Sequence, residues 1–384
     1  MPANNQFTMQ DPRKQYPIDD THYDTTQPDP GLDAILSPKA DHGEKTYQGS
    51  DRLTGRKALI TGGDSGIGRA VAIAFAREGA DVMINYLPSE EQDANTVLKE
   101  LQAADVKAFA VAGDISDEKF CQSLVQQAAE KLGGIDILVN NAGKQQFVEE
   151  LADLSSEQFQ QTYATNVFAM FWITKAALQH MPAGASIINT TSIQSYQPSA
   201  GLLDYASSKS AITGFTKSLA KMLIKKGIRV NAVAPGPIWT PLQQSGGQPA
   251  DKLEEFGQHT PMGRPGQPAA PDLAGLAGPA HRRLLLLRGP GSRGGSRHRA
   301  RRNQRHRLGE RPAAPEPGPR RPARAGPRPA RLAPPRLGPP GRAGRLGAPD
   351  PRNRRNAPSD RADGPLARRM AQDRAARKPA SFAG

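Results

Sequence analysis

The chain of 384 residues has a single cysteine, Cys121, so no disulfide can form within it. We expect this thiol to be a packing residue of a helix. No apolar run approaches the roughly 18 residues that span a bilayer. The first residues also lack the basic start and apolar core of a signal peptide. The seven histidines form no metal-ligand spacing. These absences favour a cytoplasmic protein with no membrane partner and no metal site.

The last part of the chain has the most unusual composition. Residues 271–384 lack Val, Ile, Thr, Tyr, Trp and Cys, and they hold 28 of the 51 lysines and arginines but 7 of the 37 acidic residues. This gives the tail a net charge of +21 and leaves −7 for residues 1–270. Because such a segment cannot bury enough apolar surface to fold, we predict a disordered basic tail. It is either an arm that neutralises nucleic-acid phosphates or a solvated segment without an evolved role.

Between these ends, apolar runs alternate strictly with helical patterns. The runs lie at 57–61, 81–85, 106–112, 135–140, 186–190 and 228–234, and the helical segments lie near 66–79, 89–104, 117–132, 155–180 and 203–226. This alternation predicts an α/β fold, a doubly wound parallel sheet with helices on both faces. Capping-box patterns at Ser89 and Ser155 mark two of the helix starts. Residues 1–50 are polar and lack apolar periodicity, so we expect an extended, largely disordered arm before a domain at 51–270.

A glycine-rich turn follows the first predicted strand. Gly62, Gly63, Gly66 and Gly68 come directly before a helical pattern. Glycines let the backbone approach a pyrophosphate closely, and a helix amino terminus supplies N–H donors. Glycine is common in tight turns, so the turn alone is weak evidence. It gains weight from Asp114-Ile115 and from Asn140-Asn141-Ala142-Gly143, which follow two other predicted strands.

One constellation points to proton transfer. Tyr205 and Lys209 lie four residues apart, which places them on one face of a helix, and Ser192 precedes the tyrosine by thirteen residues. A phenol has a pKa of about 10 in isolation. We expect the neighbouring ammonium to lower that pKa and the serine hydroxyl to hold a substrate oxygen. A solvated helix face is the alternative for the Tyr/Lys pair by itself.

Together these motifs resemble the short-chain dehydrogenase/reductase family, over roughly residues 38–270. The matching motifs are Thr61 to Gly68, Asn140 to Gly143, Asn166, the Ser192/Tyr205/Lys209 set and Pro235-Gly236. The extended N-terminus and the stretch Leu53 to Gly66 resemble the bacterial general-stress branch, which includes NADP-dependent aldehyde reductases. The resemblance implies a Rossmann-like fold and hydride transfer between a nicotinamide and a small carbonyl or alcohol.

The resemblance also implies roles for individual residues. Tyr205 would donate the proton during reduction, Ser192 would orient the oxygen, Lys209 would lower the phenol pKa and hold the ribose, and Asn166 would support a water relay. An asparagine in a long helix also often mends a local backbone irregularity. The cofactor would contact Thr61, Gly62, Asp64, Ser65, Gly66, Ile67, Gly68, Asn85, Tyr86, Asp114, Ile115, Asn140, Ala142, Gly143, Tyr205, Lys209, Pro235, Gly236 and Ile238.

We predict NADP as the cofactor, with NAD as the alternative. No acidic residue occurs in the run Asn85 to Pro88 that ends the second strand, where NAD-preferring members bind the ribose hydroxyls. Asp64 in the glycine turn argues the other way. For the substrate side, residues 239–262 predict a mobile lid. Gln145, Gln146, Gln194 and Tyr196 suggest a polar pocket for a small aldehyde or polyol.

The resemblance gives the tail a third interpretation, an out-of-frame product of a GC-rich gene. The family continues here with a helix and a seventh strand, which in that family build subunit contacts of a homotetramer. Leu285-Leu286-Leu287-Arg288 is what family codons for Ser-Ser-Tyr-Val give when read one base early. The normal last helix and strand would then be missing, leaving the sixth strand as an edge. Two further functions remain open: a non-catalytic cofactor-binding protein or, with a genuine tail, a nucleic-acid-binding protein.

Overall fold

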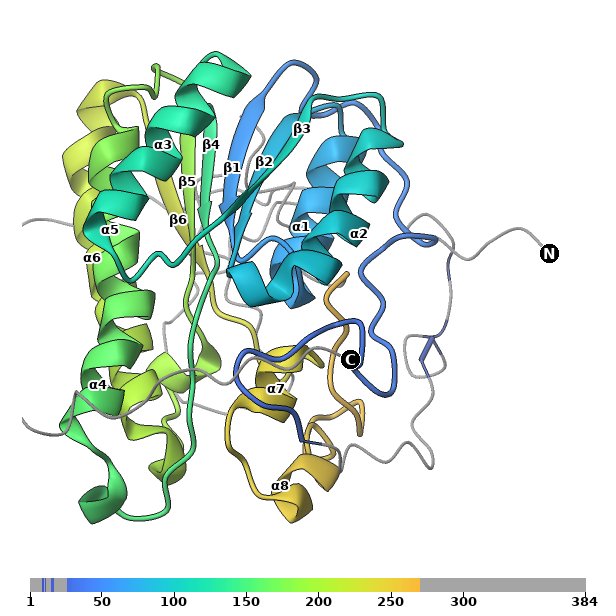
Figure 1. The fold of residues 1–384 in the computed structure, drawn as a ribbon, viewed down its shortest axis with the longest axis vertical. Helices are drawn as coiled ribbons and strands as arrows, with labels where there is room; N and C mark the ends of the chain where they lie inside the picture. The colour runs from blue at the N-terminus through green and yellow to red at the C-terminus, as the bar shows by residue number, and fades with distance from the viewer. Residues whose placement is uncertain (1–8, 10, 12–14, 17–25, 270–384) are drawn as a thin grey trace, which may run out of the picture. The chain divides into compact units, whose positions relative to one another are not determined.

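The structure is a computed structural model that describes residues 9, 11, 15–16 and 26–269 (Figure 1). The predicted tail, its out-of-frame origin and the fate of the seventh strand lie outside these residues.

A six-stranded parallel sheet forms the centre of the described domain. Its order is β3-β2-β1-β4-β5-β6. The strands are β1 (Lys57–Thr61), β2 (Asp81–Tyr86), β3 (Ala108–Ala112), β4 (Ile137–Asn140), β5 (Ser186–Thr190) and β6 (Arg229–Val233). All five pairings are parallel. The order reverses between β1 and β4, and the crevice outside the strand ends at such a point is where open α/β sheets bind ligands.

Helices cover both faces of the sheet, as the alternating pattern predicted. They are α1 (Gly66–Arg77), α2 (Glu91–Gln102), α3 (Glu118–Leu132), α4 (Ser156–Tyr163), α5 (Ala169–Ala177) and α6 (Leu203–Leu223). Alternate side chains of a strand enter different cores. Ile60 of β1 packs with α1 and α2, whereas Leu59 packs with α3, α5 and α6. The predicted Rossmann-like fold is therefore confirmed for the described residues.

Two local expectations need correction. The helix expected at 155–180 is interrupted by a π-helical turn at Ala164–Phe168, which separates α4 from α5. Ser155 caps α4 by accepting a hydrogen bond from the Gln158 N–H. Ser89, in contrast, caps nothing, because α2 begins after a 3₁₀ turn in which the Glu90 carboxylate accepts from the Leu87 N–H.

The N-terminal arm differs most from expectation. Residues 26–50 are not largely disordered, since Leu36, Asp33 and His42 are buried against the domain. The segment, dark blue in Figure 1, runs beside α1 and reaches α7 (Pro241–Ser245). Its contacts are with side chains and helix ends rather than with a sheet, so apolar periodicity could not reveal them.

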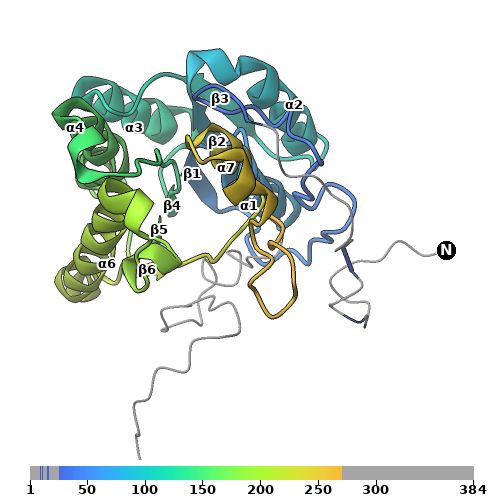
Figure 2. The same ribbon diagram turned by 90° about the horizontal axis from the view of Figure 1, so that it is seen from below.

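The predicted lid contains two short helices, α7 and α8 (Ala250–Glu254). Figures 1 and 2 show α7 below the sheet and beside α1, and Thr240 contacts the start of α1 at Gly66. Trp239 is fully buried, and its indole N–H donates to the Pro38 carbonyl. The segment is therefore tied to the N-terminal arm. Among the described helices none is long and apolar enough to cross a bilayer.

Candidate active site

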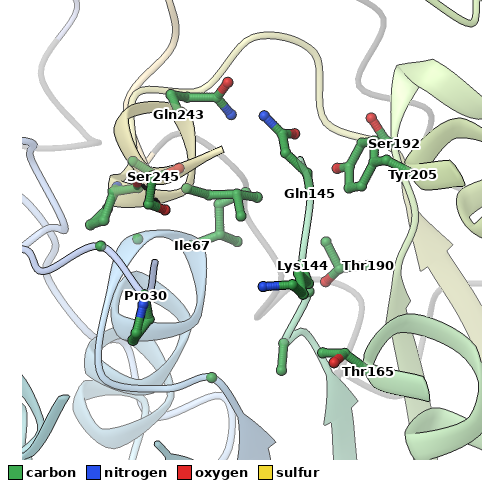
Figure 3. A pocket seen from close by; sticks show the side chains of 18 of the residues that line it. Pro30, Ile67, Lys144, Gln145, Thr165, Thr190, Ser192, Tyr205, Gln243 and Ser245 are labelled. Carbon is green, nitrogen blue, oxygen red and sulfur yellow. Dashed lines mark hydrogen bonds between the residues drawn. The ribbon is translucent and has the colours of Figure 1, made fainter. Parts of the chain in front are cut away.

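A pocket of about 1020 Å³ opens at the carboxyl ends of the strands. The glycine turn and the end of β2 form one side, and the segments after β4 and β5 and the start of α6 form the other. Helix α7 and residues 29–31 complete the wall (Figure 3). The pocket therefore lies at the reversal point of the sheet, where the sequence motifs were expected to meet.

Most of the predicted site residues line this pocket. They are Gly62, Asp64, Ser65, Gly66, Ile67, Asn85, Tyr86, Asp114, Ile115, Ala142, Gly143, Ser192, Tyr205, Lys209, Pro235, Gly236 and Ile238. Four others, Thr61, Gly68, Asn140 and Asn166, lie behind the wall.

Of these four residues, Thr61 and Asn166 hold the backbone of the wall in place. The Thr61 hydroxyl accepts hydrogen bonds from the Asn141 and Ala142 N–H groups. The Asn140 amide points away from the pocket and donates to Thr174 and to another asparagine on β5. Asn141, which belongs to the motif but was not among the predicted cofactor contacts, does line the pocket and donates to the carbonyls of Thr61 and Gly62. The Asn-Asn-Ala-Gly turn is thus locked onto the glycine turn.

The glycine turn is packed so closely that two of its positions have no room for a side chain. A Cβ on Gly68 would lie 1.8 Å from the Gly62 carbonyl oxygen, and one on Gly63 would lie 2.5 Å from Ile84 Cγ2. Gly62 and Gly66 have positive φ, which side-chain-bearing residues rarely adopt. One Asp64 carboxylate oxygen is buried in the same wall without a hydrogen-bond partner in the described part of the chain. The glycine turn and the unpartnered Asp64 oxygen together fit a dinucleotide, because its ribose hydroxyls could donate to that oxygen.

Ser192, Tyr205 and Lys209 converge on the other side. Figure 3 shows Ser192 and Tyr205 next to each other. The Lys209 Nζ lies 5.3 Å from the centroid of the Tyr205 ring and donates to the Thr190 carbonyl at 2.9 Å. The predicted constellation is therefore one cluster with all three side chains buried.

The pKa of Tyr205 shifts in the direction opposite to expectation. Burial raises the pKa of this phenol to about 12, and the Ser192 hydroxyl beside it lowers that pKa only in part. Burial also lowers the pKa of the Lys209 ammonium to about 8. Desolvation disfavours the charged form of both groups, so the neighbouring ammonium does not dominate. The phenol is consequently protonated at neutral pH.

Asn166 lies in the π-helical turn and makes three hydrogen bonds. Its Oδ1 accepts from the Lys144 N–H at 2.7 Å, and its Nδ2 donates to the Lys144 carbonyl at 2.9 Å and to Ser208 Oγ at 3.0 Å. The side chain therefore fixes the backbone of the pocket wall after β4.

The pocket also contains an acidic residue that the sequence interpretation missed. No acid was expected near the end of β2, yet Glu90, four residues beyond Tyr86, lines the wall. Burial, together with the Asp93 and Asp29 carboxylates, raises the pKa of Glu90 to about 7. Burial and Glu90 likewise raise the pKa of Asp64 well above its usual range. Two carboxyl groups thus face the region where a 2'-phosphate was expected.

On the predicted substrate side, Gln145 and Gln194 line the pocket, whereas Gln146 and Tyr196 do not. Gln145 is 4% exposed, and its Nε2 has no hydrogen-bond partner among the described residues. A Cβ on Gly246 would lie 2.7 Å from that nitrogen, so the lid backs this amide closely. Figure 3 shows Gln145 between Gln243 of α7 and the Ser192/Tyr205 pair.

Fold and pocket define a protein of the dinucleotide-binding α/β class. The sequence model of the short chain dehydrogenase family matches residues 56–250. The uncharacterized oxidoreductase YghA of Escherichia coli is 58% identical over 261 residues, which cover 68% of this chain and 88% of the relative. General stress protein 39 of Bacillus subtilis is 48% identical, over 62% of this chain and 83% of the relative. The NADPH-dependent aldehyde reductase 1 of Arabidopsis thaliana is 42% identical, over 65% of this chain and 88% of the relative.

A solved structure agrees with these relatives. A short chain dehydrogenase of Burkholderia cenocepacia in complex with NADP has 36% identity and a TM-score of 0.54, over 59% of this chain and 92% of that one. This chain belongs to the short chain dehydrogenase family of oxidoreductases. The family resemblance inferred from the motifs is therefore confirmed.

Proposed function

We propose that this protein is an NADP(H)-dependent oxidoreductase that interconverts a small carbonyl compound and the corresponding alcohol. The observation that carries the proposal is the position of the buried Tyr205 beside Ser192. Both side chains lie on the opposite side of the pocket from the glycine turn, where the dinucleotide is proposed to bind. When bound, NADPH supplies the hydride. The chain's own residues bind it, orient the substrate oxygen and supply the proton.

Each residue has a proposed role. Tyr205 donates its phenolic proton to the substrate oxygen, for which its raised pKa keeps it in the protonated form. Ser192 orients that oxygen beside the phenol. Lys209 holds a ribose hydroxyl, and its hydrogen bond to the Thr190 carbonyl fixes its position. Asn166 positions Lys144 and the wall after β4.

NADP is favoured by the relatives, namely the NADPH-dependent aldehyde reductase and the NADP complex. The carboxyl groups of Asp64 and Glu90 do not oppose this choice when they are protonated, because a neutral carboxyl group can donate a hydrogen bond to a phosphate. The raised pKa of each group favours that state. We therefore retain NADP and treat NAD as the alternative.

The substrate is proposed to be a small aldehyde that carries hydroxyl groups, or the related polyol. Gln145 supports this, because its unpaired buried Nε2 is a hydrogen-bond donor that a substrate hydroxyl would satisfy. A relative from Daucus carota is named glucose and ribitol dehydrogenase, which agrees with this class.

The Tyr205→Phe variant tests the proposal. It keeps the ring and removes the acid, so we expect kcat for NADPH-dependent aldehyde reduction to fall at least about 100-fold. The dissociation constant of NADPH should change less than about threefold. Tyr163→Phe is the matched control, because the Tyr163 hydroxyl that it removes donates a hydrogen bond to Ser207, and neither residue lines the pocket. Full turnover in Tyr205→Phe would refute the assignment.

A further inference from the structure

The segment 26–47, which we call the strap, lies outside the region that the family model matches, which begins at residue 56. Asp29, Pro30 and Gly31 of the strap line the pocket. Figure 3 shows Pro30 on the side opposite Ser192 and Tyr205. The wall on this side is thus built in part from residues that precede the family's glycine turn.

The strap is fastened to the two helices beside the glycine turn. Asp33 Oδ2 accepts a hydrogen bond from the Gly66 N–H at 3.2 Å, at the first residue of α1. The Asp33 and Ala34 N–H groups donate to the two oxygens of Asp93 on α2, at 2.6 and 2.9 Å. Residues 33 and 34 therefore cannot shift without breaking contacts to α1 and α2.

A second set of contacts fastens the strap to the lid. The Gln27 N–H and side-chain amide donate to the carbonyl and side chain of Gln244 on α7. The Gln244 Nε2 in turn donates to the Ser37 carbonyl at 3.1 Å. A Cβ on Gly31 would lie 2.8 Å from the Pro241 carbonyl oxygen, so strap and α7 are in close contact. Residues 28–32 are thus held between contacts to α7 on one side and contacts of residues 33 and 34 to α1 and α2 on the other.

One ion pair crosses the pocket from this fixed stretch. Asp29 pairs with Lys144, which follows β4 on the facing wall. Lys144 is 19% exposed and Asp29 is 49% exposed, so the pair lies at the mouth rather than in the core. Asn166 holds the backbone of Lys144 in place. The backbone of both Asp29 and Lys144 is thus held in place by neighbouring contacts.

We propose that the strap is part of the dinucleotide site and that the Asp29–Lys144 pair is a latch, which closes over a bound nicotinamide dinucleotide. This inference rests on the proposed function only in requiring that the pocket binds such a dinucleotide. Because the pair joins facing walls at the mouth, the dinucleotide enters and leaves when the pair is open. The latch therefore slows association and dissociation alike.

The signature of a latch differs from that of a direct contact. Opening the latch raises both rate constants, whereas losing a contact to the dinucleotide raises mainly the dissociation rate. NADH is the suitable probe, because it lacks the 2'-phosphate, the group of NADPH that is expected to lie nearest Glu90. A partly exposed ion pair is a weak interaction, so each rate should rise about two- to fivefold on its loss.

The experiment is stopped-flow nucleotide fluorescence on the full-length chain. We expect Asp29→Asn and Lys144→Gln each to raise the association and dissociation rate constants for NADH. The rate constants of the double variant should not exceed those of either single variant. The swapped pair, Asp29→Lys with Lys144→Asp, should restore slow exchange. Gln27→Ala, which loosens the strap at α7, should raise the same two rates. Lys45→Gln and Glu149→Gln, at exposed positions outside the pocket lining, are the controls.

Three results would overturn the latch. Unchanged rates in all variants would show that the strap only wraps the domain. Faster dissociation in Lys144→Gln combined with slower dissociation in Asp29→Asn would show that Lys144 binds the dinucleotide and Asp29 competes for it. Failure of the unaltered chain to bind either NADH or NADPH would overturn the proposed function as well. This outcome is distinguishable from the first two results, in which the unaltered chain still binds the dinucleotide.

Discussion

The buried His42 should make the stability of the protein depend on pH near neutrality. Its Nε2 lies 3.0 Å from Asp33 Oδ2, and its Nδ1 lies 3.1 Å from Glu44 Oε1. The first contact is close but poorly aligned, since that nitrogen has no acceptor of good hydrogen-bond geometry, so we treat it as an ion pair. Arg69 faces the same two carboxylates.

These neighbours determine the sign of the effect. Burial lowers the pKa of His42, but the contacts with Asp33 and Glu44 outweigh it and raise the pKa from 6.5 to about 8. A raised pKa means that the folded state binds the proton more tightly than the unfolded state. The stabilisation is therefore complete below about pH 6.5 and is lost as the pH rises through 8. The shift corresponds to about 2 kcal/mol of unfolding free energy.

Urea denaturation of the wild type and of His42→Gln measures this effect. The difference in unfolding free energy between them should decline by about 2 kcal/mol from pH 6 to pH 9. Comparing the two proteins at each pH cancels other groups that titrate in this window, such as Glu90. Lys45→Gln should track the wild type throughout. A difference that stays flat over this range would refute the reasoning.

Three further predictions concern the pocket. Glu90→Gln should tighten NADPH binding at pH 8. Wild-type NADPH affinity should rise as the pH falls through about 7, where Glu90 protonates, and this rise should be absent in the variant. Calorimetry that finds no difference between the two proteins would exclude a role for this carboxylate. Gly68→Ala should lower stability by about 1–3 kcal/mol and impair nucleotide binding, because its Cβ meets the Gly62 carbonyl. Gly214→Ala, in open space on α6, should instead raise stability by about 1 kcal/mol. Gln145→Leu should raise KM about two- to tenfold for a hydroxylated aldehyde but not for a plain alkyl aldehyde; equal changes for both would exclude it as a specificity residue.

The strands and the glycine turn could be predicted because each is encoded locally. Leu59 and Ile60 belong to one apolar run, and parallel strands buried on both faces are recognisable by such runs. Gly62 and Gly66 stand where the chain must adopt positive φ. The spacing of Tyr205 and Lys209 places them on one helical face.

What could not be predicted depends on contacts between residues far apart in the sequence. Glu90 is the last residue of the 3₁₀ turn Pro88–Glu90, and the packing of that turn on the domain brings its carboxylate into the wall. The π-helical turn around Asn166 is accompanied by hydrogen bonds to Lys144, 22 residues earlier. The rise in the Tyr205 pKa follows from burial, which the Tyr/Lys spacing does not encode.

The N-terminal segment is attached to α1 at both ends of the helix, which bears on where the domain begins. Asp33 bonds the first residue of α1, and Glu78, fully buried at the other end, receives hydrogen bonds from Tyr47, Arg52 and the Ser50 N–H. These hydrogen bonds outweigh the effect of burial and lower the pKa of the Glu78 carboxyl group to about 2. Residues 26–50 therefore pack on the domain expected at 51–270, and we infer that they fold together with it. Because α1 also begins at the glycine turn, strap and glycine turn share one rigid support, and a cofactor bound between them would contact both.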